Sequence, residues 1–102
     1  MKINVEGLDF KVTFDPKLFA DGQKFGICKF YEARIIVDSS THPLMQKETL
    51  LHEVIHACLN RQGLEQQSEE AMLIEENFVN KLVPSLLQTM KKNKEFTRYI
   101  LE

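Results

Sequence analysis

Two histidines and a glutamate stand close together in the middle of the chain. His52 and His56 are four residues apart and Glu53 directly follows the first, in the order H-E-x-x-H. On a helix, residues four apart project from one face, so both imidazoles could bind a single metal ion. Glu53 would lie about 100° further round the helix, where it could reach a water molecule at that metal. The pattern predicts a zinc site with Glu53 as the catalytic base.

The residues around this motif favour metal binding over a helix with two solvent-facing histidines. The motif lies in a largely apolar segment that includes Leu51 and Ile55. Burying two imidazoles and a carboxylate without partners costs free energy. Zinc would remove that cost, because neutral imidazoles would become its ligands. We therefore expect zinc as the cofactor.

A catalytic zinc ion needs a third protein ligand and an open position for water. Glu75 and Glu76 both lie in the next helical segment, and helical phase alone does not separate them. Asn80 follows Glu76 by one turn, where it could accept a hydrogen bond from a zinc-bound imidazole and fix its tautomer. We therefore prefer Glu76 as the third ligand, with Glu75 as the alternative and Asn80 as its supporting residue.

Other polar residues could assist without binding the metal. Hydrolysis at such a site would form an oxyanion that a further side chain could stabilise, and the sequence does not choose among Tyr31, Tyr99, His42 and Arg61. His42 precedes Pro43 and is expected mainly to begin a helix.

The two cysteines are expected to be structural. Cys58 is expected to pack in the core rather than bind metal, because it lies on a different helix face from His56. Cys28 is expected to be a strand residue.

The part of the chain that precedes the motif is expected to form β-strands. Residues 3–14 show alternating apolar positions, with a turn at Glu6–Gly7, and Asp21–Gly22 is a further turn signal. Residues 25–38 form a second β-rich stretch, with a hairpin turn near residues 31–33. These segments predict a small, mainly antiparallel sheet of three or four strands.

Two long helices are expected after the sheet, which makes the fold class α+β. The first runs from about Leu44 to Arg61, with Thr41 or His42 as its cap and Gly63 as its end. The second begins after Ser68 and has an apolar stripe from Met72 to Met90. Pro84 should kink or loosen this second helix, and residues 96–101 add a short terminal helix.

Composition limits the classes of partner and location. The 102 residues predict one domain over 1–102, and 43% hydrophobic with 27% charged residues is an ordinary soluble balance. A net charge of -2 gives no reason to expect nucleic acid or a membrane surface as a partner. No segment looks like a membrane span or an export signal. We therefore expect a cytoplasmic protein with Cys28 and Cys58 as free thiols.

The two helices together resemble a known family of zinc peptidases. An H-E-x-x-H helix followed by a glutamate helix resembles the gluzincin arrangement. Residues 76–87 read ENFVNKLVPSLL, which is similar to the E-x-x-A-N-x-F-A-x-x-L-L pattern of ImmA/IrrE-type peptidases. Glu76 and Asn80 match its polar positions, whereas Pro84 and the absent alanines depart from it. The small size and residues 49–53 also resemble minimal peptidase-like proteins of phages and prophages.

The resemblance implies a zincin-like fold and a peptidase activity. In such a fold the substrate lies extended along an edge strand, which the hairpin 25–38 would supply. The implied substrate is a protein or peptide, such as a regulatory protein. The alternative is a catalytically weak or inactive, zinc-stabilised module that binds a protein partner.

Overall fold

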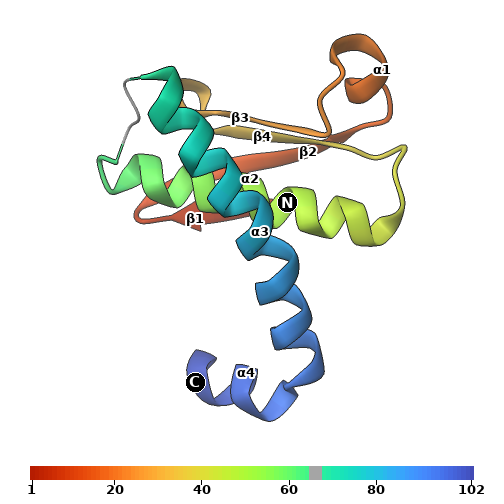
Figure 1. Cartoon of the computed structure of the whole chain (residues 1–102). Coiled ribbons are helices and arrows are strands. Elements are labelled where there is room, and N and C mark those ends of the chain that lie inside the picture. Colours follow the sequence, from red (N-terminus) through yellow and green to blue (C-terminus); the bar gives the residue numbers. More distant parts are fainter. Residues whose placement is uncertain (65–67) are drawn as a thin grey trace. The chain divides into compact units, whose positions relative to one another are not determined.

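Four strands form one sheet in the computed structural model, which describes residues 1–64 and 68–102. Their order across the sheet is β1-β2-β4-β3 (Figure 1). The pairs β1–β2 and β3–β4 are antiparallel, whereas β2 and β4 are parallel. The predicted mainly antiparallel sheet is therefore confirmed, with β1 and β3 as its edge strands. The strand bounds are β1 Lys2–Val5, β2 Leu8–Asp15, β3 Gly26–Lys29 and β4 Arg34–Asp38.

Both predicted hairpin turns are present. Glu6 and Gly7 have φ values of 49° and 88°, as in the tight turns whose twist suits an antiparallel pair. Between β3 and β4 the chain forms the short 3-10 helix η1 (Phe30–Glu32), and Ala33 follows with a left-handed φ of 50°. These local turns fix which residues of each strand face one another.

The first long helix, α2 (Pro43–Arg61), has both of its predicted ends. The Nδ1 atom of His42 accepts a hydrogen bond from the backbone N–H of Leu44 at 3.1 Å, so His42 is the cap. At the other end Gly63 has a φ of 77°. The backbone N–H of Leu64 donates to the carbonyl of Leu59 at 3.0 Å. This hydrogen bond is typical of a glycine-terminated helix.

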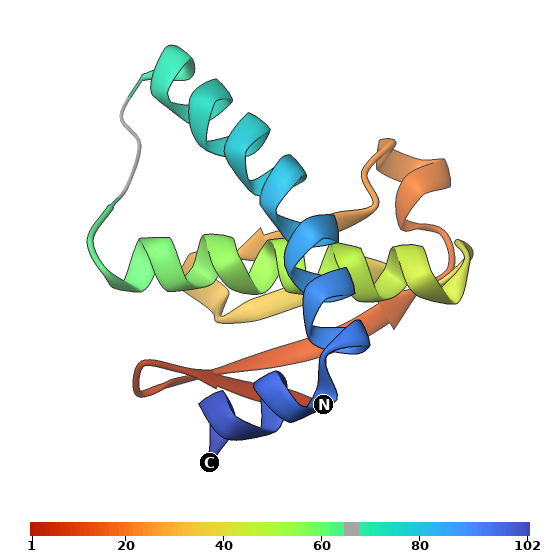
Figure 2. The same cartoon turned by 60° about the horizontal axis from the view of Figure 1, so that its bottom comes forward.

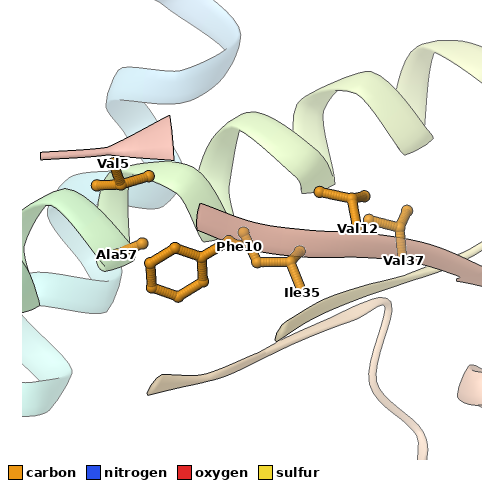
Figure 3. Close-up of a cluster of buried hydrophobic side chains, with 6 residues drawn as sticks. All are labelled: Val5, Phe10, Val12, Ile35, Val37 and Ala57. Atoms are coloured by element: carbon orange, nitrogen blue, oxygen red, sulfur yellow. The ribbon is translucent and has the colours of Figure 1, made fainter. Parts of the chain in front are cut away.

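The core lies between α2 and one face of the sheet (Figures 1 and 2). Side chains alternate along a strand, so Ile35 and Val37 face α2 and are fully buried, whereas Ile36 faces the other way. Figure 3 shows the buried cluster that joins strands and helix: Val5, Phe10, Val12, Ile35, Val37 and Ala57. This packing fixes α2, which carries the H-E-x-x-H motif, relative to the sheet.

A short helix, α1 (Leu18–Gly22), occupies the region where the sequence predicted only a turn. The buried carboxylate of Asp38 accepts hydrogen bonds from the backbone N–H of Phe19 at 2.6 Å and of Ser40 at 2.8 Å. The Ser40 hydroxyl also donates to it. The rings of Phe19 and Phe25 stack with centroids 4.5 Å apart. The hydrogen bond from Phe19 to Asp38, 19 residues away, stabilises α1, and no pattern within residues 18–22 predicts it.

The chain divides into two compact units, Met1–Gln66 and Gln67–Glu102. The first holds the sheet, α1 and α2, and the second holds α3 (Glu69–Lys92) and α4 (Lys94–Leu101). The prediction of a single domain over 1–102 stays a prediction.

The second unit consists of helices whose ends follow the predicted signals. The hydroxyl of Ser68 accepts a hydrogen bond from the backbone N–H of Ala71 at 3.1 Å, which caps α3. Helix α3 continues through Pro84, and a kink there stays a prediction. Met72, at the start of the predicted apolar stripe, is 57% exposed. Within residues 1–64 and 68–102, none of the helices has the length and apolar content that a membrane crossing requires.

Candidate metal centre

Helix α2 brings the two histidines of the motif together. The Nε2 atoms of His52 and His56 lie 3.1 Å apart, and the ring planes cross at 63° with centroids 4.7 Å apart. Two nitrogens bound to one tetrahedral zinc ion at about 2.0–2.1 Å would lie about 3.3 Å from each other. The observed separation is close to that value. The two half-buried imidazoles therefore fit a shared metal ion with little rearrangement.

Glu53 points toward the sheet and is buried. Glu53 is only 9% exposed. A Cβ atom built on Gly26, at the start of β3, would lie 3.2 Å from the Cγ of Glu53 and 3.5 Å from its Oε1. The main chain of the edge strand therefore lies directly beside the Glu53 side chain. The sequence predicted a role for Glu53 but not this neighbour.

Cys28 lies on the same face of β3 as Gly26, because side chains alternate along the strand. The pKa of its thiol is raised from 9.0 to about 12, first by burial and then by the negative charge of Glu53. A thiol that stays protonated at neutral pH is a poor nucleophile and a poor metal ligand. Cys28 therefore acts as a packing residue, as expected for a strand position.

The exposure of Cys58 differs from what the sequence predicted. Both cysteines are free thiols, as expected, but Cys58 is exposed rather than packed in the core. The neighbouring Ala57 is the residue of this turn that is fully buried against the sheet. One step along a helix rotates the side chain by about 100°. Cys58 is thereby turned away from the strands.

The predicted third donors lie on α3, in the second compact unit, whereas His52 and His56 lie on α2 in the first. Glu75 and Glu76 are both half-buried residues of α3, and Asn80 is exposed. The third-ligand role of Glu76, the alternative of Glu75 and the supporting role of Asn80 stay predictions.

The four candidates for oxyanion stabilisation have different surroundings. His42 caps α2, and the Nη2 atom of Arg61 donates to the backbone carbonyl of Glu6 at 3.1 Å. These two side chains therefore have structural partners. Tyr31 is fully exposed beyond the end of β3, and Tyr99 is 80% exposed on α4. An oxyanion role for any of the four stays a prediction.

Gly26 and Thr49 were missed by reasoning from the sequence. The Cγ2 atom of Thr49 would lie only 2.5 Å from a Cβ atom at position 26. A glycine inside a strand often marks a close approach of another segment. That signal was present in the sequence, but the partner segment could be identified only from the fold.

Comparison with known proteins gives no family assignment. No family model matches the chain, and no curated protein or solved structure shows significant similarity to it. The zincin resemblance therefore depends on the motifs themselves. The donor geometry and the packing around Glu53 are the structural observations on which a function can be argued.

Proposed function

We propose that the chain is a zinc-dependent peptidase that hydrolyses peptide bonds of a protein substrate. The observation that carries the proposal is the paired Nε2 atoms of His52 and His56 at 3.1 Å. Two imidazoles at chelating distance, with a glutamate following the first, form a donor set suited to hydrolytic zinc chemistry. A surface pair of histidines would need neither this separation nor a buried glutamate between them.

His52, His56 and Glu76 would hold the zinc ion, since two imidazoles and one carboxylate are a common ligand set of catalytic zinc. A bound zinc ion would acidify a water molecule and polarise the carbonyl of the scissile bond. The carboxylate of Glu53 accepts a proton from the attacking water and later donates it to the leaving amine. Burial of Glu53 beside β3 supports this role, because it restricts the orientation of the carboxylate.

Strand β3 offers a place for the substrate. It pairs with β4 on one side and is an edge of the described sheet. An extended peptide can add to such an edge by main-chain hydrogen bonds. Because Gly26 lies beside Glu53, a peptide paired along β3 would pass close to the proposed base. We propose this edge as the peptide-binding surface of a cytoplasmic enzyme, with a separate regulatory protein as its substrate.

The alternative is a zinc-stabilised module that binds a protein without cleaving it. Exposed apolar side chains on α3 favour such a role: Leu73, Ile74 and Phe78 are more than 60% exposed. Exposed apolar clusters are typical of surfaces that bind other proteins. The two functions differ in what they require of Glu53, since only hydrolysis needs a base.

A charge-removing substitution separates the two functions. Glu53→Gln should keep about one zinc ion per chain and lose cleavage of a proteome-derived peptide library, with a fall of at least about 100-fold. Glu48→Gln on the same helix is the matched control and should cleave at the parental rate. His52→Ala should lose the metal in elemental analysis. Cleavage by Glu53→Gln at the parental rate would refute the peptidase mechanism.

A parental protein that binds no zinc would refute the zinc site itself. A parental protein that binds zinc but leaves every library peptide intact would instead favour the binding module. Both measurements use the full chain.

A further inference from the structure

Strand β3 and helix α2 approach each other closely at Gly26, a position without a side chain. A Cβ atom on Gly26 would lie 2.5 Å from the Cγ2 of Thr49, closer than real Cβ atoms approach any neighbour. It would also lie 3.2 Å from the Cγ of Glu53. Gly7 and Gly63 have a positive φ, but Gly26 does not. It is therefore required here for space rather than for backbone conformation.

The threonine in this contact cannot easily move aside. Thr49 lies within α2, where a β-branched side chain is restricted in its χ1 rotamer. A larger residue at position 26 must therefore push β3 away from α2 or displace Glu53. Glu53 has the longer side chain with more rotatable bonds, so a crowded Cβ atom at position 26 displaces its carboxylate more easily than it displaces the Thr49 side chain.

Glu53 is confined by β3 at two successive inward positions. Gly26 lies beside its Cγ and Oε1 atoms, and burial, together with the charge of Glu53, raises the pKa of Cys28, the next inward residue of the strand. The main chain of β3 thus forms one wall of the Glu53 environment. The same strand is the edge at which a peptide would pair.

We propose that Gly26 is a positioning residue for Glu53, with Thr49 setting how closely β3 can lie against α2. Because Gly26 has no side chain, β3 can lie close to α2, and this sets the distance between the proposed base Glu53 and the peptide-binding edge. A displacement of about 1 Å between a base and its substrate can cost about 100-fold in rate. The inference rests on the proposed peptidase function, and it assigns a role to a residue that binds neither metal nor substrate through a side chain.

The chain provides a control and a rescue for this proposal. Gly26→Ala introduces the crowded Cβ atom. Gly22→Ala is the control, because nothing lies within 4 Å of a Cβ atom there and its φ is ordinary. Thr49→Ser removes the Cγ2 atom that Gly26→Ala would meet. The double variant Gly26→Ala with Thr49→Ser should therefore lose the closest clash and return most of the way to the parental geometry.

Four quantities should be measured on each full-length variant. They are the rate of cleavage of a proteome-derived peptide library, the zinc dissociation constant by competition with a chromogenic chelator, the melting temperature, and the ¹³C shift of the Glu53 carboxyl carbon. The last is recorded on metal-free protein, so it reports the placement of Glu53 independently of activity.

Gly26→Ala should lower the cleavage rate by about 100-fold and move the Glu53 resonance, while the zinc dissociation constant stays at the parental value. Gly22→Ala should match the parent in every measurement. Thr49→Ser in the Gly26→Ala background should restore most of the rate and return the resonance toward its parental position, which is a coupling expected only of residues in contact.

Several outcomes would overturn the inference. One is cleavage by Gly26→Ala at the rate of Gly22→Ala. Another is a slow double variant whose Glu53 resonance is no closer to the parent than that of Gly26→Ala alone. If Gly26→Ala does not fold, the double variant decides, and its failure to fold or to cleave also counts against the proposal.

Failure of the proposed function would look different. A parental protein without peptidase activity would refute that function, while the Glu53 resonance would still show whether Gly26 positions the carboxylate.

Discussion

Phe10 offers a quantitative test of how the sheet supports α2, the helix that carries the H-E-x-x-H motif. It is fully buried in the cluster that includes Ala57, the residue after His56. Phe14 lies on the same strand and the same face but is 45% exposed. The two phenylalanines are therefore a matched pair that differ mainly in burial. Replacing each by alanine compares the loss of a core contact with the loss of a peripheral one.

The expected difference follows from burial. Removing a fully buried phenylalanine costs about 3–5 kcal/mol, because a cavity adds to the lost transfer free energy. Phe14 has about half of its surface buried, so Phe14→Ala should cost about 1–1.5 kcal/mol of transfer free energy. The variants should differ by about 2–3 kcal/mol in the free energy of unfolding. For a domain of this size that corresponds to about 10–15 °C in melting temperature.

Urea unfolding followed by circular dichroism measures both free energies on metal-free protein, with the slope of the transition as a check on two-state behaviour. Zinc at about 100 times its dissociation constant should then stabilise either folded variant by about 2.7 kcal/mol, since the ligand pair itself is intact. The reasoning is refuted if Phe10→Ala is no less stable than Phe14→Ala.

Three further predictions concern residues outside the metal site. Hydrogen bonds from Ser40 and Phe19 hold the pKa of the Asp38 carboxyl below its usual value. Its contribution to stability is therefore complete above the unfolded-state pKa and is lost as the pH falls through the lower folded value. Asp38→Asn should be less stable at neutral pH and should show a flatter loss of stability below about pH 4; an unchanged acid profile would contradict this. Gly63→Ala should cost about 1 kcal/mol or more because of its φ of 77°, and equal stability of parent and variant would exclude a role for the left-handed turn. In folded protein at pH 8, a thiol reagent should modify exposed Cys58 well before Cys28, whose pKa is raised to about 12; mass spectrometry of the labelled peptides checks the order.

Much of the fold could be predicted because its signals are local. Gly7 and Gly63 supply left-handed positions at a turn and at a helix end. His42 and Ser68 supply side-chain caps for the two long helices. Each signal concerns residues within a few positions of one another, so a single sequence carries it. The α+β class and the approximate helix bounds follow from these signals.

The remaining features depend on contacts between distant residues. The parallel pairing of β2 with β4 and the support of α1 by Asp38 arise only when the strands are assembled. Burial of Ala57 instead of Cys58 depends on the rotation of α2 against the sheet. No periodicity within one segment determines these relations.

In the candidate site, too, some residues could be predicted from the sequence and others could be found only from the fold. His52, Glu53 and His56 were recognisable because a helix brings residues of this spacing together. The choice of Glu76 over Glu75 rests on sequence reasoning about Asn80 and stays a prediction. The contact of Gly26 with Thr49 and Glu53 joins residues more than 20 positions apart. A sequence pattern can identify the chemical groups, but not the backbone that confines them.

The edge position of β3 also bears on how the protein behaves in concentrated solution. A strand with a neighbour on one side only can pair with the same strand of another molecule, which leads to self-association. Here β3 has only four residues, and its end carries the charged pairs of Glu32 with Lys29 and Arg34. A short strand ending in a cluster of charges limits antiparallel pairing with a copy of itself. Aggregation through this edge is thereby less favourable.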